Sequence, residues 1–189
     1  MSRQKGDIMR EVMISIQPKW CKLISSGQKT VEVRKNRPNC EVPFKCYIYC
    51  TKGKPTFSQS AFCDNVSNGK VIGEFVCDRI IDISYMDLFE NFRRLTHDII
   101  TPSCLKVKEL EEYLNTKDGY GWHITDLVVY DEPRELRDFK PYNRTEEDCK
   151  FSHLGLAIPK CKDCRECYVK RPYQSWGYVE ATEPRQTAD

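Results

Sequence analysis

The chain has 189 residues, a formal net charge of +2, 40% hydrophobic residues and 31% charged residues. This length fits one domain that can bury a sizeable core, and the composition excludes an intrinsically disordered chain. A global polycation is also excluded, so any nucleic-acid-binding surface must be local. Because no apolar run approaches the roughly 20 residues of a membrane span, we expect no membrane partner.

Eleven cysteines are an unusually high number for a chain of this size. The opening residues, MSRQKGDIMREVMISI, contain no apolar core of a secretory signal, so we expect a cytoplasmic protein. In a reducing compartment, clustered cysteines indicate a metal site or catalysis more than disulfide bonds.

The first elements change from strand to helix and back to strand. VMISI at 12–16 predicts a strand, and 17–27 predicts a short helix with Pro18 in its first turn and Gly27 just past its end. KTVEVRK at 29–35 alternates, with Val31 and Val33 on one side and polar side chains on the other. Residues 44–50 and 70–80 predict two further strands.

The later sequence has helical character between two strand regions. Residues 84–116 predict a helical insertion, which begins with an imperfect capping box at Ser84 and Asp87. Strand character returns at 124–130, and a Cys-rich segment at 149–170 precedes a last strand. We therefore expect a single α+β domain over 11–181, a small β-barrel with flanking helices, with flexible tails at 1–10 and 182–189.

The sequence GQKTVEVR fits the pattern Gly-x-Lys-x-x-Glu-x-Arg, with Gly27, Lys29, Glu32 and Arg34 in place. With the preceding strand and helix and the later strand GKVIGEF, it resembles the ASCH domain, a branch of the PUA-like barrels. This resemblance implies a PUA-like β-barrel that binds RNA or a nucleotide in a cleft beside the motif strand. The match covers about residues 13–83 and leaves out the helical insertion and the Cys-rich segment.

Some members of this family are similar to small amidohydrolases that remove an acyl group from modified cytidine. The resemblance implies that these enzymes use the motif Lys, a Thr and a later Glu, which correspond here to Lys29, the position of Glu32, and Glu74. The Thr is therefore replaced by a carboxylate in this chain. Lys29, Glu32 and Glu74 are our candidate catalytic residues.

Glu74 follows the strand pattern of an otherwise apolar segment, where a carboxylate needs a partner. Lys29 and Arg34 are the obvious candidates. A Lys29–Glu74 couple can shuttle a proton during attack on an amide or ester, or it can be an ion pair that locks two strands together. Both readings place the two groups in one shared cleft.

A local basic patch lies between residues 19 and 37, where six Lys or Arg residues accompany one acid. Such a patch beside aromatic rings suits a single-stranded nucleic acid, although a solvated face is an equal alternative. Arg34 can hold a phosphate bidentately, or it can form a structural pair with Glu32. The candidate ligand-binding residues are Arg34, Lys35, Trp20, Lys19 and Tyr49, and for Trp20 core packing is an alternative.

Three cysteines in CKDCREC, Cys161, Cys164 and Cys167, have the spacing of zinc ligands. Cys149 or His153 can supply the fourth ligand, so a structural zinc ion is the one cofactor we expect. Free surface thiols and a redox pair are the alternatives. For His97 and His123 we expect structural roles.

Three functions remain open from the sequence. The first is a module that binds RNA or a nucleoside in a cleft lined by Lys29, Glu32, Arg34 and Glu74. The second is a small hydrolase, either an amidohydrolase acting on acylated cytidine or a ribonuclease-like enzyme, and the third is a zinc-stabilised interaction module.

Overall fold

The structure, a computed structural model, describes residues 10–52, 68–142 and 167–182. Within these residues the chain is a mixed α+β protein, as the sequence predicts. Its strands and main helices are β1 (Glu11–Ile16), α1 (Pro18–Ser25), β2 (Val31–Arg34), β3 (Phe44–Cys50), β4 (Val71–Cys77), β5 (Ile80–Ile83), α2 (Phe92–Leu95), α3 (Thr101–Ser103), α4 (Val107–Leu114), β6 (Gly119–His123), β7 (Thr125–Arg134), β8 (Phe139–Pro141) and β9 (Trp176–Ala181). Short turns of other helix types are η1 (Tyr85–Leu88), η2 (Thr96–Ile100) and η3 (Leu136–Asp138).

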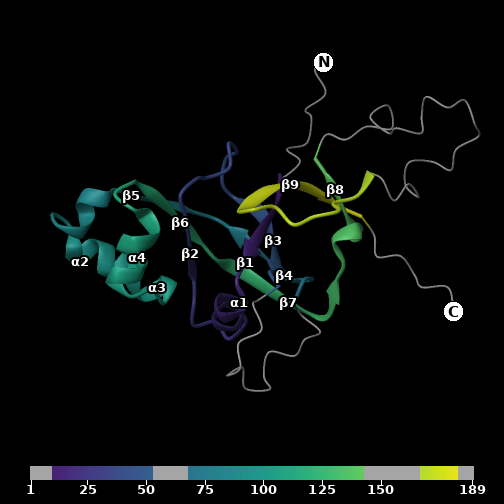
Figure 1. Ribbon diagram of the computed structural model, residues 1–189, viewed down its shortest axis with the longest axis horizontal. Helices are drawn as coiled ribbons and strands as arrows, with labels where there is room; N and C mark the ends of the chain where they lie inside the picture. The colour runs from purple at the N-terminus through teal and green to yellow at the C-terminus, as the bar shows by residue number, and fades with distance from the viewer. Residues whose placement is uncertain (1–9, 53–67, 143–166, 183–189) are drawn as a thin grey trace, which may run out of the picture.

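The strands form two sheets (Figure 1). The larger sheet has six strands in the order β7-β4-β3-β1-β9-β8, and the smaller has three in the order β2-β6-β5. β1 and β3 run parallel, while the other paired strands of both sheets run antiparallel. Among the described residues neither sheet closes on itself, so the closed barrel that the sequence predicts is not confirmed.

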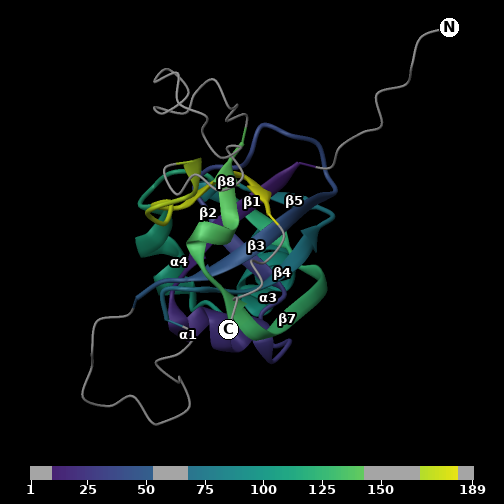
Figure 2. The same ribbon diagram turned by 90° about the vertical axis from the view of Figure 1, so that its right-hand side faces the viewer.

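Helix α1 connects the two sheets. Pro18 stands in its first turn, where a missing N–H costs nothing, and Gly27 follows its end with φ of +73°, a conformation that favours glycine. Cys21 and Ile24 are buried on one face of the helix and pack into the main core. The helix lies at one end of the larger sheet and connects β1 to β2, as Figure 2 shows at the bottom of the view.

Helical segments between β5 and β6 cover one face of the smaller sheet, at the left end of Figure 1. They occupy Tyr85–Leu114, where the sequence predicts an insertion, and the Ser84–Asp87 capping box is present. Val31 and Val33 of β2 pack against apolar side chains of these helices, Leu95, Ile99, Ile100, Leu110 and Leu114. Because side chains alternate along a strand, Glu32 and Arg34 point the other way.

The two faces of the larger sheet bury different cores. Val12 and Ile14 of β1 and Phe75 of β4 face the main core, which also contains Trp122 of the smaller sheet. Met13 and Tyr47 face a separate cluster on the opposite side, closed by residues of β8 and β9. The face of the larger sheet on which a side chain lies therefore decides whether that side chain can approach β2.

Within the described ranges, no helix is long and apolar enough to cross a membrane. Residues 1–9 and 183–189 of the predicted tails lie outside those ranges, as do residues 149–166 of the Cys-rich segment.

Candidate functional site

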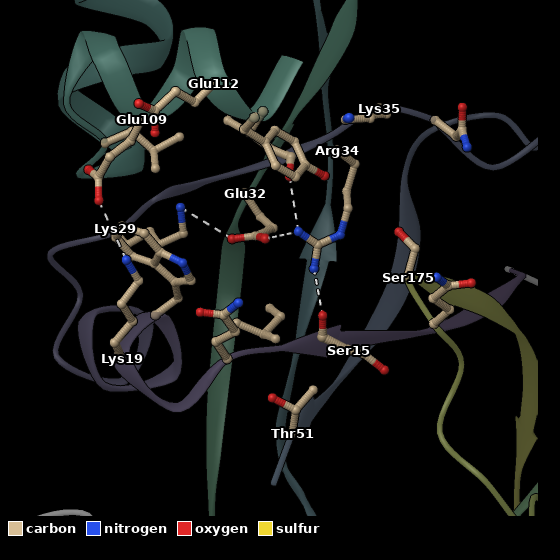
Figure 3. A pocket seen from close by; sticks show the side chains of 18 residues that line it. Ser15, Lys19, Lys29, Glu32, Arg34, Lys35, Thr51, Glu109, Glu112 and Ser175 are labelled. Carbon is tan, nitrogen blue, oxygen red and sulfur yellow. Dashed lines mark hydrogen bonds and ion pairs between the residues drawn. The ribbon is translucent and has the colours of Figure 1, made fainter. Parts of the chain in front are cut away.

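A polar cleft of about 910 Å³ lies where β2, α1, α4 and the chain just before β9 meet (Figure 3). Its lining combines charged, amide, hydroxyl and aromatic side chains from segments that are far apart in the sequence. The lining residues that matter below are Ser15, Gln17, Lys19, Trp20, Lys29, Glu32, Arg34, Lys35, Thr51, Glu109, Glu112, Tyr113, Gln174 and Ser175.

The floor of the cleft is an ion network built by the β2 motif. Glu32 lies between Lys29 and Arg34: one carboxylate oxygen accepts a hydrogen bond from Arg34 Nη1, and the other lies 3.2 Å from Lys29 Nζ (Figure 3). Lys29 Nζ also donates to the Ser103 carbonyl at 2.8 Å, and Arg34 Nη2 donates to the Ser15 carbonyl at 2.7 Å. The network thus ties β2 to α3 and to β1.

This network is almost sealed from solvent. Lys29, Glu32 and Arg34 have exposed fractions of 2%, 4% and 8%. Two cations against one carboxylate leave a net charge of +1 in a buried layer, which is costly without further anionic or polar partners. Arg34 Nε and Glu32 Oε2 are buried and have no hydrogen-bond partner among the described residues. The floor therefore favours an anionic group in the cleft above it.

The walls carry accessible cations that lie over aromatic rings. Lys19 Nζ is 4.0 Å from the centroid of the half-buried Trp20 ring, and Lys35 Nζ is 5.3 Å from that of Tyr113. Lys19 also reaches across to Glu109 of α4, with Nζ 3.5 Å from Oε1. Exposed cations and π-faces side by side are the groups with which proteins hold a nucleic-acid strand.

Glu74 does not belong to this cleft, so the predicted Lys29–Glu74 pair is wrong. Alternation along β4 places Phe75 and Cys77 in the main core and Glu74 on the opposite face of the larger sheet. Its carboxylate binds Lys45 Nζ at 2.9 Å and accepts a hydrogen bond from the Tyr130 hydroxyl at 2.5 Å. The hydrolase hypothesis loses the pair on which it depends.

The surroundings of Glu74 are those of a half-exposed surface pair. Partial burial alone would raise the pKa of its carboxyl group, but the hydrogen bonds from Tyr130 and Lys45 outweigh it and lower the pKa. Burial and the bond to Glu74 in turn raise the pKa of Tyr130 above its ordinary range. Glu74 is therefore ionised at neutral pH, and neither it nor its partners Lys45 and Tyr130 line the cleft beside β2.

The other predicted site residues divide between cleft and core. Arg34, Lys35, Trp20 and Lys19 line the cleft, and their role in ligand binding remains a prediction. Tyr49 does not: it is 3% exposed and packs in the cluster on the opposite side of the larger sheet. The sequence pattern of β3 cannot distinguish its two faces because both are apolar.

Sequence reasoning missed the contributions of α4 and of the chain before β9. Glu109, Glu112 and Tyr113 have the i, i+3, i+4 spacing of one helix face, which is the only sequence signal they carry. Tyr113 is 38% exposed, whereas Leu110 and Leu114 of the same helix are buried. Ser15 and Ser175 line the cleft because of the register in which β1 and β9 pair, and the sequence does not show that register.

The zinc prediction remains a prediction. Cys149, Cys161, Cys164 and His153 lie outside the described residues, and Cys167 is buried. No group of three or more potential metal ligands occurs within the described ranges. Both histidines in those ranges pair with an aspartate through Nδ1 at 2.7 Å. His97 pairs with Asp98, and His123 pairs with Asp78.

Comparison with known proteins identifies the fold. The family model described as "ASCH domain" matches residues 14–182. A tyrosine-to-phenylalanine variant of the ASCH protein ZmASCH from Zymomonas mobilis aligns with a TM-score of 0.55 and 19% identity, over 90% of this chain and 91% of that one. The ASCH structure from the same organism aligns with a TM-score of 0.52 and 19% identity, over 90% and 88% of the two chains. A search of curated proteins finds no match.

Proposed function

The chain belongs to the ASCH domain family, and from this premise we propose that it binds single-stranded RNA or a nucleotide in the cleft beside β2. The observation that carries the proposal is a buried layer of net charge +1 beneath a polar cleft whose walls present exposed lysines over aromatic rings. A phosphate is attracted by the charge of the floor, and a base can stack on Trp20 or Tyr113.

The division of labour among the cationic residues follows from their burial. Lys29 and Arg34 are almost fully buried, so they set the charge of the floor and position β2, and neither offers the exposed surface of a wall lysine. Lys19 and Lys35 are exposed and line the cleft, so they make the phosphate contacts. The cleft volume of about 910 Å³ falls within the roughly 300–1,000 Å³ of small-ligand sites, enough for a nucleotide rather than a duplex.

The experiment compares two double variants by fluorescence anisotropy with a labelled single-stranded RNA at several salt concentrations. Lys19→Ala/Lys35→Ala removes the two exposed cations of the cleft. Arg93→Ala/Lys117→Ala removes two exposed cations that do not line it. Each phosphate contact on a single strand contributes about 0.7 to the slope of log K against log salt, so the cleft variant loses about 1.4 of slope.

The control variant is expected to keep both its affinity and its salt slope. Equal losses of RNA affinity in the two double variants would show that binding depends on the net charge of the protein alone and would contradict the assignment of the cleft. A wild-type protein that fails to bind RNA and nucleotides would overturn the proposal.

A further inference from the structure

The charges that line the cleft are divided between two sides (Figure 3). Lys29 and Arg34 in the floor, with Lys35 at the end of β2, form a cationic side. Glu109 and Glu112 of α4 form an anionic side, where Lys19 pairs with Glu109. A site built only to attract phosphate gains nothing from carboxylates, because they repel the phosphate. The anionic side therefore needs a separate explanation.

The two carboxylates of α4 differ in how far their own protein neighbours satisfy them. Glu109 Oε2 accepts the Lys106 N–H at 2.9 Å and Oε1 accepts from Lys19 Nζ at 3.5 Å. Among the described residues Glu112 has one ion pair, with Oε1 3.8 Å from Lys108 Nζ, and both side chains are largely exposed. Glu112 is therefore the carboxylate that retains acceptor capacity toward a ligand.

The opposite side independently indicates an anionic ligand. Arg34 is more than nine-tenths buried and lines the cleft, yet its Nε has no hydrogen-bond partner among the described residues. The floor to which it belongs has a net charge of +1. A ligand that suits both sides has a negative group at one end and N–H donors at the other.

We propose that the cleft prefers nucleotides whose base carries an amino group and that Glu112 is the residue that selects them. This inference rests on the proposed function. An ionised carboxylate is an acceptor only, so it accepts from the amino groups of cytosine and adenine. Uracil and hypoxanthine have a carbonyl oxygen at the corresponding position, which the carboxylate repels.

Two matched ligand pairs isolate the amino group. Pentacytidylate and pentauridylate differ at the pyrimidine amino position, and adenosine and inosine monophosphates differ at the purine amino position. Titration calorimetry with the wild-type protein is expected to show tighter binding of the amino member in each pair, by about tenfold, as for one carboxylate–amino contact.

Glu112→Gln and Glu111→Gln separate recognition from net charge. Both remove one charge from an exposed position of α4, but Glu111 does not line the cleft. With Glu112→Gln the ratio within each pair is expected to fall to near one, because the amide also donates to the carbonyl oxygen. With Glu111→Gln the tenfold ratio is expected to persist.

The outcomes distinguish this inference from the proposed function. Binding of both members with equal affinity, or a ratio that Glu112→Gln leaves unchanged, overturns the role of Glu112 and leaves the proposed function standing. If Glu112→Gln and Glu111→Gln abolish the affinity ratio equally, the role of Glu112 is likewise overturned and the proposed function still stands. Absence of binding to all four ligands overturns the proposed function itself.

Discussion

Two ion networks, each centred on one glutamate, lie on opposite sides of the larger sheet. In the cleft, Glu32 joins Lys29 and Arg34, and all three side chains are at most 10% exposed. On the outer face, Glu74 joins Lys45 and Tyr130, and the exposed side-chain fractions of Glu74 and Lys45 are 22% and 34%. The residue types are similar, but the first network forms the floor of the cleft beside β2 and the second does not line that cleft.

This difference in burial shows that strand alternation can place similar residues in different environments, where they have different roles. A sealed network cannot exchange its partners for water, so its integrity supports the fold and its net charge reaches the ligand. A half-exposed network is screened by solvent and contributes little to either. The following predictions test this contrast from the largest expected effect to the smallest.

Glu32→Ala is expected to be the most damaging of these substitutions. It leaves Lys29 and Arg34 buried without a counter-charge, which costs about 3–5 kcal/mol of unfolding free energy. Urea denaturation followed by circular dichroism measures the loss. Glu74→Ala is the matched control, and a similar loss in both variants would contradict the contrast between the networks.

Trp20→Ala tests the ligand-facing wall of the cleft. Loss of a stacking surface is expected to weaken RNA binding by about 1–3 kcal/mol, measured by fluorescence anisotropy. Trp20→Phe, which keeps a ring, is expected to retain most of the affinity. If Trp20→Ala binds RNA as tightly as the wild type while remaining folded, the ring only packs against the core.

Glu74→Gln is expected to cost at most about 1 kcal/mol, because its pairs are partly screened by solvent. The pKa of Glu74 is lowered in the folded state from its ordinary 4.5, so its ionised form stabilises the fold. The difference between wild type and variant is therefore complete above pH 4.5 and fades as the pH falls through the lowered pKa. Urea titrations across acidic pH measure this, and a difference that grows with acidity would contradict it.

Lys45→Ala is expected to leave RNA affinity and its salt slope unchanged, since Lys45 serves Glu74 on the outer face. Lys19→Ala in parallel shows the effect of a cleft lysine. An equal loss of affinity from both would mean that RNA covers the outer face as well.

Much of the local structure could be predicted from the sequence. The motif strand alternates as expected, with Val31 and Val33 in the helical core and Glu32 and Arg34 toward the cleft. Helix α1, with Pro18 and Gly27 at its two ends, and the Ser84–Asp87 capping box also carry short-range signals. These features depend on neighbours within a few residues, and the sequence shows those directly.

The partners of Glu74 could not be predicted, because they depend on register. Lys45 pairs with Val76 and Tyr130 lies two residues beyond Val128, so both are diagonal neighbours of Glu74. The register also shifts between Val71 and Gly73, which breaks the simple alternation along β4. Glu112 was missed for a similar reason: only the packing of α4 against β2 brings it to the cleft.

A titration of the isotope-labelled protein with a short single-stranded RNA, followed by amide chemical shifts, tests the central claim most directly. We expect the largest shifts at Lys19, Trp20, Lys35 and Glu112, with Lys45, Glu74 and Tyr130 unaffected. Shifts concentrated on the Glu74 face, or no shifts at saturating RNA, would contradict the assignment of the cleft as the binding site.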